Sequence, residues 1–164
     1  MKKINLEVLV KRLRRARAAI DDPGRYGLGL GGYDPGSDTP YDEGGYCDCT
    51  GFVAWVAGVN RRPKPSRKWW IESTACYTDA MGPQTVFHRI PQPIPGCFGF
   101  YPDRGGKQGH GFIVSKVRSE KDFDIIDCSP SNDDDDGKAV NERKGAWVLK
   151  RKPVFCVFQQ DLLP

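Results

Sequence analysis

The fold is predicted from the segment Tyr46-Cys47-Asp48-Cys49-Thr50-Gly51-Phe52-Val53, which continues into four more apolar residues, 54–57. A helix drawn through residues 52–57 is apolar on every side, and a helix of that kind is buried. Asp48 is a favourable N-cap residue because its carboxylate can accept N–H groups of the first turn. The sequence therefore predicts a buried helix from about Cys49 to about Gly58, with Cys49 in its first turn.

A cysteine in the first turn of a helix is well placed to act as a nucleophile. The helix N-terminus carries a partial positive charge and free N–H groups, which favour the thiolate, the reactive form of cysteine. The same N–H groups can hold an oxyanion after the thiolate attacks a carbonyl. The carboxylate of Asp48 opposes the thiolate, so the site needs a partner cation.

His110 is the expected base. It opens a predicted strand, 109–114, and the glycines beside it allow another backbone or a substrate to come close. An imidazole there can take the thiol proton and later deliver it to a leaving amine. Asp127 is the first candidate for the group that orients the imidazole, because it ends the next strand and adjacent strands place their ends side by side. Asn132 is the reserve candidate.

Two nearby residues offer alternative interpretations. His88 is a rival base, although it lies between Phe87 and Arg89 in an expected loop and lacks the strand context. Cys47 is either a loop thiol, which we favour, or a redox partner of Cys49. A cysteine in an apolar helix is more often a small buried hydrophobe than a nucleophile, so the order of the residues carries the hypothesis.

The rest of the sequence predicts helices in the first half of the chain and strands in the second half. An amphipathic helix is expected in residues 1–22, and a third helix from a cap at Ser66 through Trp69 and Trp70 toward Met81. Segments rich in aromatic and β-branched residues predict strands at 97–101, 110–117, 122–128, 145–150 and 153–158. This order indicates an α+β fold, with helices packed on a mostly antiparallel sheet of five to six strands. At 164 residues the chain has room for a single domain, 1–164.

Charge and composition exclude several classes of protein. The net charge is +4, and basic residues cluster near the N-terminus and at 61–68, which suits an anionic polymer surface or a solvated helix face equally. The chain shows no nucleic-acid-binding motif. It also has no apolar stretch of membrane-spanning length and no signal-peptide pattern, so we expect synthesis in the cytoplasm, reduced thiols and no membrane insertion.

The sequence gives little indication of a metal-binding site. The six cysteines include no C-x-x-C pair, so a zinc site is not expected. The acidic run 132–137 imitates the start of a calcium loop, but Arg143 stands where the twelfth-position glutamate belongs. We therefore favour a solvated acidic turn and leave calcium as the alternative. The proposed chemistry requires no cofactor.

These motifs resemble, in the same order, those of the NlpC/P60 family of cysteine peptidases. The similarity covers roughly residues 38–130. The matching segments are Pro40-Tyr41, Gly44-Gly45, Asp48-Cys49-Thr50-Gly51-Phe52-Val53, Pro95-Gly96-Cys97-Phe98-Gly99-Phe100-Tyr101, Gly109-His110-Gly111-Phe112-Ile113-Val114 and Ile125-Ile126-Asp127. Three positions depart from the family pattern: Thr50 replaces a serine, Cys97 an aspartate, and Asp127 a histidine, asparagine or glutamine.

The resemblance implies a papain-like core and an enzyme that cleaves peptide bonds in bacterial peptidoglycan, next to a D-amino acid or diaminopimelate. It also implies that the hydroxyl of Tyr41 contributes to the oxyanion hole. Catalysis is thus assigned to Cys49, His110, Asp127 and Tyr41. Substrate binding is assigned to Asp48, Thr50, Trp69 and Gly109, with Trp69 as a stacking platform.

By analogy the setting is a phage lysin released by a holin, a tail-associated lysin or an antibacterial effector. A phage tail component or an immunity protein would then be a partner, and we expect a monomer. Two alternatives remain open. The same thiol chemistry could serve acyl transfer, deamidation or cleavage of a protein substrate, or the chain could be a non-enzymatic wall-binding module.

Overall fold

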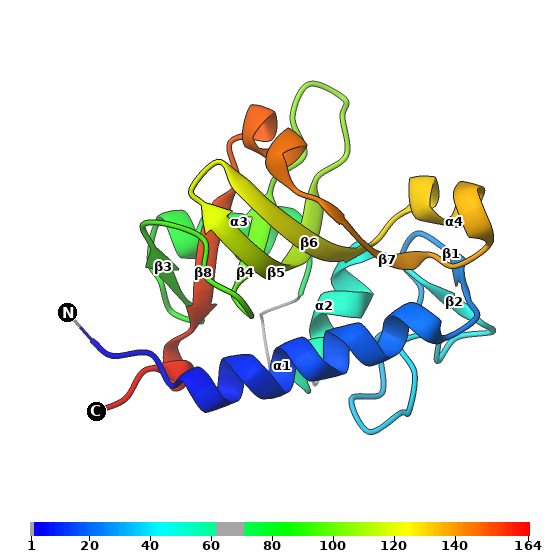
Figure 1. Cartoon of the computed structure of the whole chain (residues 1–164), viewed down its shortest axis with the longest axis horizontal. Coiled ribbons are helices and arrows are strands. Elements are labelled where there is room, and N and C mark those ends of the chain that lie inside the picture. Colours follow the sequence, from blue (N-terminus) through cyan, green and yellow to red (C-terminus); the bar gives the residue numbers. More distant parts are fainter. Residues whose placement is uncertain (1, 62–70) are drawn as a thin grey trace.

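The computed structural model of the chain describes residues 2–61 and 71–164, and its centre is a six-stranded sheet (Figure 1). The strand order is β3-β8-β4-β5-β6-β7, and all neighbours pair antiparallel. The strands are β3 (Phe87–Ile90), β4 (Phe98–Tyr101), β5 (His110–Ser119), β6 (Asp122–Cys128), β7 (Val140–Lys144) and β8 (Val154–Phe158). Two short strands, β1 (Arg25–Tyr26) and β2 (Tyr46–Cys47), pair in parallel.

The helices are distributed along the whole chain. The α-helices are α1 (Leu6–Ala18), α2 (Cys49–Ala57), α3 (Ser73–Met81) and α4 (Pro130–Asp136), and the 3-10 helices are η1 (Ala19–Asp21), η2 (Ala146–Arg151) and η3 (Gln159–Asp161). The predicted α+β class with a mostly antiparallel sheet is confirmed. The predicted N-terminal helix is confirmed as α1 followed by η1.

Both faces of the sheet are covered, because strand side chains alternate between two apolar layers. On one face α2 and α3 pack over a layer that includes Phe98, Phe100 and Ile113. On the other face Phe112 and Val114 belong to a second layer, which η2 covers through Val148. The central strand β5 is therefore buried on both faces over its first six residues, and α2 lies against its start.

Helix α2 matches its prediction closely. The Asp48 carboxylate accepts a hydrogen bond from the Gly51 N–H at 2.8 Å, and the helix ends at Gly58 in the left-handed conformation, φ 69°. A glycine adopts this conformation without steric cost, which makes it a favourable residue to end a helix. Every residue from Cys49 to Val56 is buried, as the apolar sequence indicated.

One predicted strand is wrong, and two strands of the six-stranded sheet, β3 and β7, were not predicted. Residues 145–150 form no strand but the 3-10 helix η2, and β7 occupies the sheet edge instead. The apolar residues of this segment suggested a strand, but Val148 is buried because η2 packs over the sheet, not because it belongs to a strand. Strands β7 and β3 are edge strands with exposed polar residues, so neither carries the aromatic and β-branched composition of a buried strand.

The third helix is shorter than expected. It begins at Ser73, and the Glu72 side chain caps it by accepting the N–H groups of Thr74 and Ala75. The expected cap Ser66 and the two tryptophans Trp69 and Trp70 lie outside the described residues.

The acidic run forms the short helix α4 rather than a turn. Ser129 caps it by accepting the Asn132 N–H, and Gly137 ends it in the left-handed conformation. Asp133 holds β1 against this helix, because its carboxylate pairs with Arg25 at 2.6 Å and accepts the Tyr26 N–H at 3.2 Å. Among the described residues no group of three or more His, Cys, Asp or Glu side chains is arranged to hold a metal ion.

Helix α1 is fixed by a buried ion pair. Arg12 pairs with Asp161 at 2.7 Å, donates to the Gly96 carbonyl at 3.1 Å, and lies 4.2 Å from the centre of the Phe98 ring. Arg12 therefore does not belong to the solvated basic face that the sequence suggested. The Asn5 N–H donates to the Asp161 carbonyl at 2.7 Å, so the two ends of the chain lie together (Figure 1).

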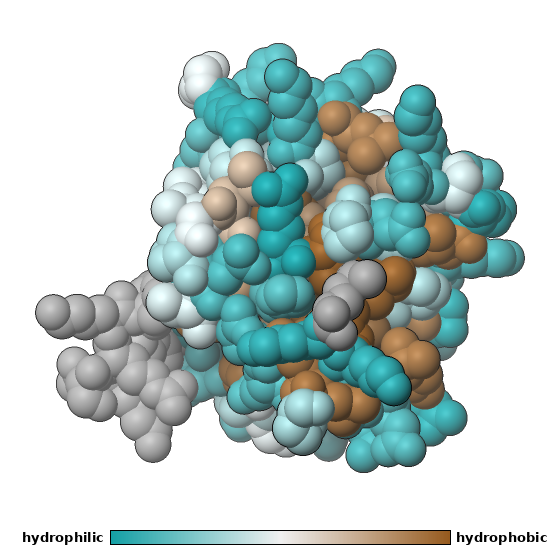
Figure 2. All heavy atoms as spheres, turned by 90° about the vertical axis from the view of Figure 1, so that its left-hand side faces the viewer, coloured by the Kyte–Doolittle hydropathy of each residue, from teal (hydrophilic) through white to brown (hydrophobic). Residues whose placement is uncertain are grey.

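The face at which the termini lie is mostly hydrophilic, with apolar residues showing between the polar side chains (Figure 2). Exposed apolar residues of the terminal segments are Leu6, Val10 and Leu163. No helix in residues 2–61 and 71–164 is long and apolar enough to cross a membrane.

Replacing Arg12 with methionine should lower the free energy of unfolding by about 3–5 kcal/mol, because it leaves the buried Asp161 carboxylate without its cation. Urea unfolding followed by circular dichroism measures the change. The matched control is Arg118→Met, which removes exposed pairs with Asp122 and Asp124 and should change stability far less. Equal effects of the two substitutions would contradict this account of α1.

Candidate active site

The structure brings Cys49, His110 and Asp127 together from three elements. Cys49 is the first residue of α2, His110 the first of β5, and Asp127 lies at the end of β6. Antiparallel pairing puts the start of β5 beside the end of β6, and α2 packs across both strands. The starts of α2 and β5 therefore meet at one end of the sheet, where Thr50 lies against Gly111 and the thiol is close enough to raise the pKa of the imidazole.

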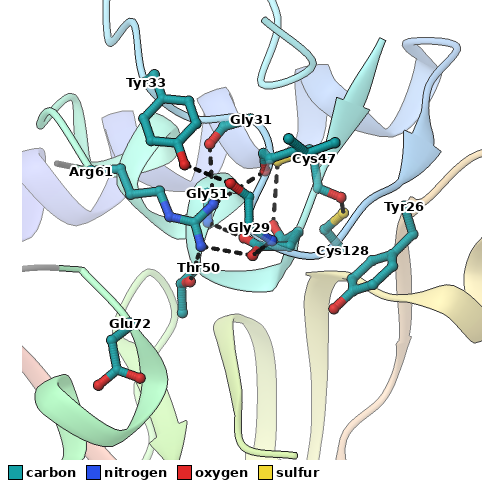
Figure 3. A network of polar contacts seen from close by, with 12 residues as sticks. Tyr26, Gly29, Gly31, Tyr33, Cys47, Thr50, Gly51, Arg61, Glu72 and Cys128 are labelled. Carbon is teal, nitrogen blue, oxygen red and sulfur yellow. Dashed lines mark hydrogen bonds and ion pairs between the residues drawn. The ribbon is translucent and has the colours of Figure 1, made fainter. Parts of the chain in front are cut away.

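The cation that offsets Asp48 is Arg61. Its guanidinium lies 2.7 Å from the Asp48 carboxylate and donates to the Thr50 hydroxyl at 3.1 Å (Figure 3). Both charged side chains are buried, so the pair is little screened by solvent. The negative charge beside Cys49 is thus neutralised inside the protein. The sequence did not reveal this role of Arg61, because Arg61 begins a basic stretch of the kind usually found on a protein surface.

The same carboxylate holds the glycine-rich loop against α2. The Gly29 N–H donates to Asp48 at 2.7 Å, and Arg61 donates to the Gly31 carbonyl at 3.3 Å. Gly32 has φ 71°, and a Cβ atom there would lie 2.0 Å from the Gly51 carbonyl oxygen. Only glycine fits so close an approach, which fixes the loop at the entrance to the site.

His110 is oriented by a buried carboxylate. Its Nε2 lies 2.6 Å from Oδ2 of Asp127, which has no exposed surface. This contact leaves Nδ1 as the nitrogen for Cys49. Burial lowers the pKa of His110, but the hydrogen bonds to Asp127 and Cys49 and their negative charges outweigh it and raise the pKa to about 9. The site therefore favours an imidazolium beside the thiol.

Asp127 has further partners. Arg143 donates from Nε to Oδ1 at 3.0 Å and from Nη2 to Oδ2 at 2.5 Å. The reserve candidate Asn132 donates to Oδ1 of Asp127 at 3.1 Å and to the Asp127 carbonyl at 3.0 Å, so it holds the aspartate and not the imidazole. Burial raises the pKa of Asp127, but the hydrogen bonds and positive charges of His110 and Arg143 lower it by more. The pKa is therefore below its ordinary value, and the carboxylate stays ionised.

Aromatic rings surround the imidazole. The ring centres of Tyr101, Trp147 and Phe112 lie 5.8, 6.2 and 6.2 Å from that of His110. Tyr101 and Phe112 are buried, whereas Trp147 is 38% exposed. The rings shield the His110–Asp127 contact from water, which strengthens it.

Tyr41 does not take the position that the resemblance implied. It is 5% exposed, packs in the core beside Gly24, and its hydroxyl accepts the Val140 N–H at 3.0 Å. Tyr26 is the tyrosine near the nucleophile, because β1 pairs it with Cys47. Burial raises the pKa of Tyr26, and its hydroxyl accepts a hydrogen bond at 3.4 Å from Gln108, a residue that lines the pocket at Cys49.

A pocket of about 220 Å³ opens at Cys49. Its lining consists of Leu28, Asp48, Cys49, Thr50, Arg61, Glu72, Ser73, Asp103 and Gln108. A second hollow of about 350 Å³ shares Leu28, Asp103 and Gln108 with it and extends the groove toward Lys107. A bound chain could therefore run across the thiol and along the loop at 103–108.

The residues assigned to substrate binding divide into three groups. Asp48 and Thr50 line the pocket, but their side chains are engaged by Arg61. Gly109 is not in the lining; a Cβ atom there would lie 2.6 Å from the Tyr101 carbonyl, so it allows two backbones to approach. Trp69 lies outside the described residues.

The two alternative residues lie elsewhere or are otherwise engaged. His88 is on β3, and β8 and β4 separate that edge strand from β5. Cys47 is fully buried, and its thiol contacts the Asp48 carbonyl at 3.3 Å. All six cysteines are free thiols.

With iodoacetamide at pH 6 the native protein should take one label, on Cys49, located by peptide mass spectrometry. The other five thiols are fully buried, and burial raises their pKa values, that of Cys97 to about 12. His110→Asn should slow the labelling at least about tenfold, because no imidazolium then stabilises the thiolate. Labelling of another cysteine first, or no effect of His110→Asn, would contradict this view.

In comparisons with known proteins, no family model and no curated protein matches the chain.

Proposed function

We propose that the chain is a cysteine hydrolase with a papain-like core of the NlpC/P60 kind, which cleaves peptide bonds in the stem peptides of bacterial peptidoglycan. One observation carries the proposal. A cysteine at the N-terminus of a buried helix lies beside a histidine, and one ring nitrogen of that histidine is held by a buried aspartate. This is the arrangement of an activated nucleophile with its base and orienting group.

The architecture supports a papain-like core. The nucleophile is on a helix that lies across an antiparallel sheet, and the base and third residue are on adjacent strands of that sheet. The order along the chain of Cys49, His110 and Asp127 is also that of the nucleophile, base and third residue in the NlpC/P60 family, which the motifs resemble. The support is architectural, and the chemistry is argued from the residues.

The reacting form is the thiolate–imidazolium pair, which results when the Cys49 thiol has passed its proton to Nδ1 of His110. The thiolate attacks the carbonyl carbon of the scissile amide, and the oxygen takes up the negative charge. The backbone N–H of Cys49 lies in the first turn of α2, where N–H groups lack intrahelical acceptors, and can donate to that oxygen. We assign the second donor to the hydroxyl of Tyr26 in place of Tyr41.

The tetrahedral intermediate then collapses. His110 gives its proton to the leaving amine, the C–N bond breaks, and the acyl group remains on Cys49 as a thioester. Water attacks this thioester while His110 accepts a proton from the water, and the thiolate leaves and recovers its proton. Asp127 keeps Nδ1 of His110 directed at the reacting atoms throughout.

The lining of the pocket favours a substrate with a positively charged group. Glu72 and Asp103 contribute carboxylates, whereas the charge of Arg61 is offset by Asp48. Diaminopimelate, at which the resemblance implies cleavage, carries an ammonium group. The biological setting remains a proposal from analogy: a monomer that reaches the wall by holin release, on a phage tail or as an effector, with a tail component or an immunity protein as partner.

Purified sacculi incubated with the wild-type protein should release muropeptides, and Cys49→Ala should reduce the release at least about 10³-fold, because no acyl-enzyme can form. Mass spectrometry of the products identifies the bond. Cys156→Ala is the matched control, since it removes a buried thiol on β8, remote from the site, and should retain activity.

Other outcomes would redirect the proposal. If sacculi release nothing while Cys49 is labelled rapidly at pH 6, the thiol serves another acyl substrate, such as a protein amide. If the protein binds sacculi equally well with and without Cys49 and labelling is slow, it is a wall-binding module.

The rate of amide hydrolysis should fall as the pH rises through about 9. The pKa of His110 is raised, so the imidazolium that protonates the leaving amine is present below about pH 9 and lost above it. Measuring kcat/KM across this range tests the prediction. Alkylation of Cys49 by iodoacetamide is the control, because it needs only the thiolate and should not fall; hydrolysis that stays constant well above pH 9 would argue against His110 as the acid.

A further inference from the structure

The carboxylate of Asp127 is engaged at both oxygens by more than one donor. Oδ2 accepts hydrogen bonds from His110 Nε2 at 2.6 Å and from Arg143 Nη2 at 2.5 Å. Oδ1 accepts hydrogen bonds from Arg143 Nε at 3.0 Å and from Asn132 Nδ2 at 3.1 Å. Two cationic side chains thus share one carboxylate that has no contact with solvent.

A buried carboxylate of this kind creates a problem for catalysis. An isolated charge inside a protein is strongly unfavourable, and the carboxylate then takes up a proton or changes its contacts. In the proposed reaction His110 gives up its proton in each cycle. If the imidazolium were the only cation beside Asp127, every transfer to the leaving group would leave the carboxylate uncompensated, and the transfer would be opposed.

We infer that Arg143 is a positioning residue that acts as the permanent counter-charge of Asp127 and so allows His110 to alternate between its charged and neutral forms. The inference rests on the proposed function and adds a residue to its machinery. Arg143 is not a catalytic residue, because it acts through Asp127. Asn132 complements it as a neutral donor that fixes the orientation of the carboxylate.

Arg143 is itself held in place. It lies on β7 opposite Ile125 of β6, and its Nη1 donates to the Ser131 hydroxyl at 3.0 Å. The guanidinium lies 4.8 Å from the centre of the Trp147 ring, and the side chain is 27% exposed. A guanidinium stays charged at every relevant pH and matches a carboxylate with two parallel donors, which a lysine cannot reproduce.

The effect of Arg143 on His110 has a definite sign. The titratable and charged groups around the imidazole are Cys49, Asp127, Tyr101, Arg143 and Arg151, the last lying over the Tyr101 ring at 4.5 Å. Arg143 repels the imidazolium and shares the carboxylate that stabilises it. Removing Arg143 should therefore raise the pH at which His110 loses its proton.

The test is an NMR titration of the imidazole in the full chain, which contains only two histidines; His88→Gln assigns the signals. In Arg143→Met the His110 midpoint should rise by about one pH unit or more, because one adjacent charge is removed. Arg143→Lys should shift it less. Arg151→Met is the matched control, since it removes a nearby arginine that does not touch Asp127. An unchanged midpoint in folded Arg143→Met overturns the inference.

Two further measurements keep the test decisive. Arg143→Gln, which is neutral but retains amide donors, replaces Arg143→Met if that variant does not fold, and the same upward shift is expected. In kinetics Arg143→Met should lower kcat at least about tenfold with little change in KM. A fall in kcat without a shift in the midpoint would indicate a merely structural role and overturn the inference. A chain that hydrolyses no amide would instead refute the proposed function, and the titration would still report on Arg143.

Discussion

The carboxylate of Asp48 is the contact on which the candidate site depends. It caps α2, holds the glycine-rich loop through the Gly29 N–H, and pairs with Arg61. One side chain thereby sets the start of the helix that presents Cys49, the wall of the pocket and the charge beside the thiol. The capping oxygen and the ion-paired oxygen are different atoms, so these tasks do not compete.

The same arrangement occurs three times among the residues that the structure describes: a buried aspartate is fixed by an arginine from another segment. The pairs are Asp48 with Arg61, Asp127 with Arg143, and Asp161 with Arg12. Burial of a lone carboxylate would be prohibitive, so each aspartate requires its partner, and the guanidinium fork restricts the geometry in which the two can meet. The pair at Asp161 joins residues 149 positions apart and so links the two ends of the chain.

Much of the fold could be predicted because its signals come from buried elements. Helix α2 is apolar all round and has a capping aspartate, and β4, β5, β6 and β8 carry aromatic and β-branched residues that only a covered sheet accommodates. The approach of His110 to Asp127 could be predicted for the same reason, since both follow from the ends of neighbouring strands.

The remainder depends on long-range contacts that composition does not encode. Arg61 and Arg143 look like ordinary surface cations until the fold supplies their aspartates. Tyr26 and Tyr41 both precede the nucleophile, and only the pairing of β1 with β2 decides which phenol lies near Cys49.

The strand order has a consequence for how the chain folds during synthesis. Strand β8 follows all other strands in the sequence, yet it lies between β3 and β4, and it is the only strand that pairs with β3 in the described sheet. Strands β4 to β7 can form from neighbours as they leave the ribosome, but β3 must wait until residue 158 emerges. Asp161, the partner of Arg12, emerges later still. We therefore expect α1 and β3 to join the structure only after translation has passed these residues, through contacts of high sequence separation, which form slowly.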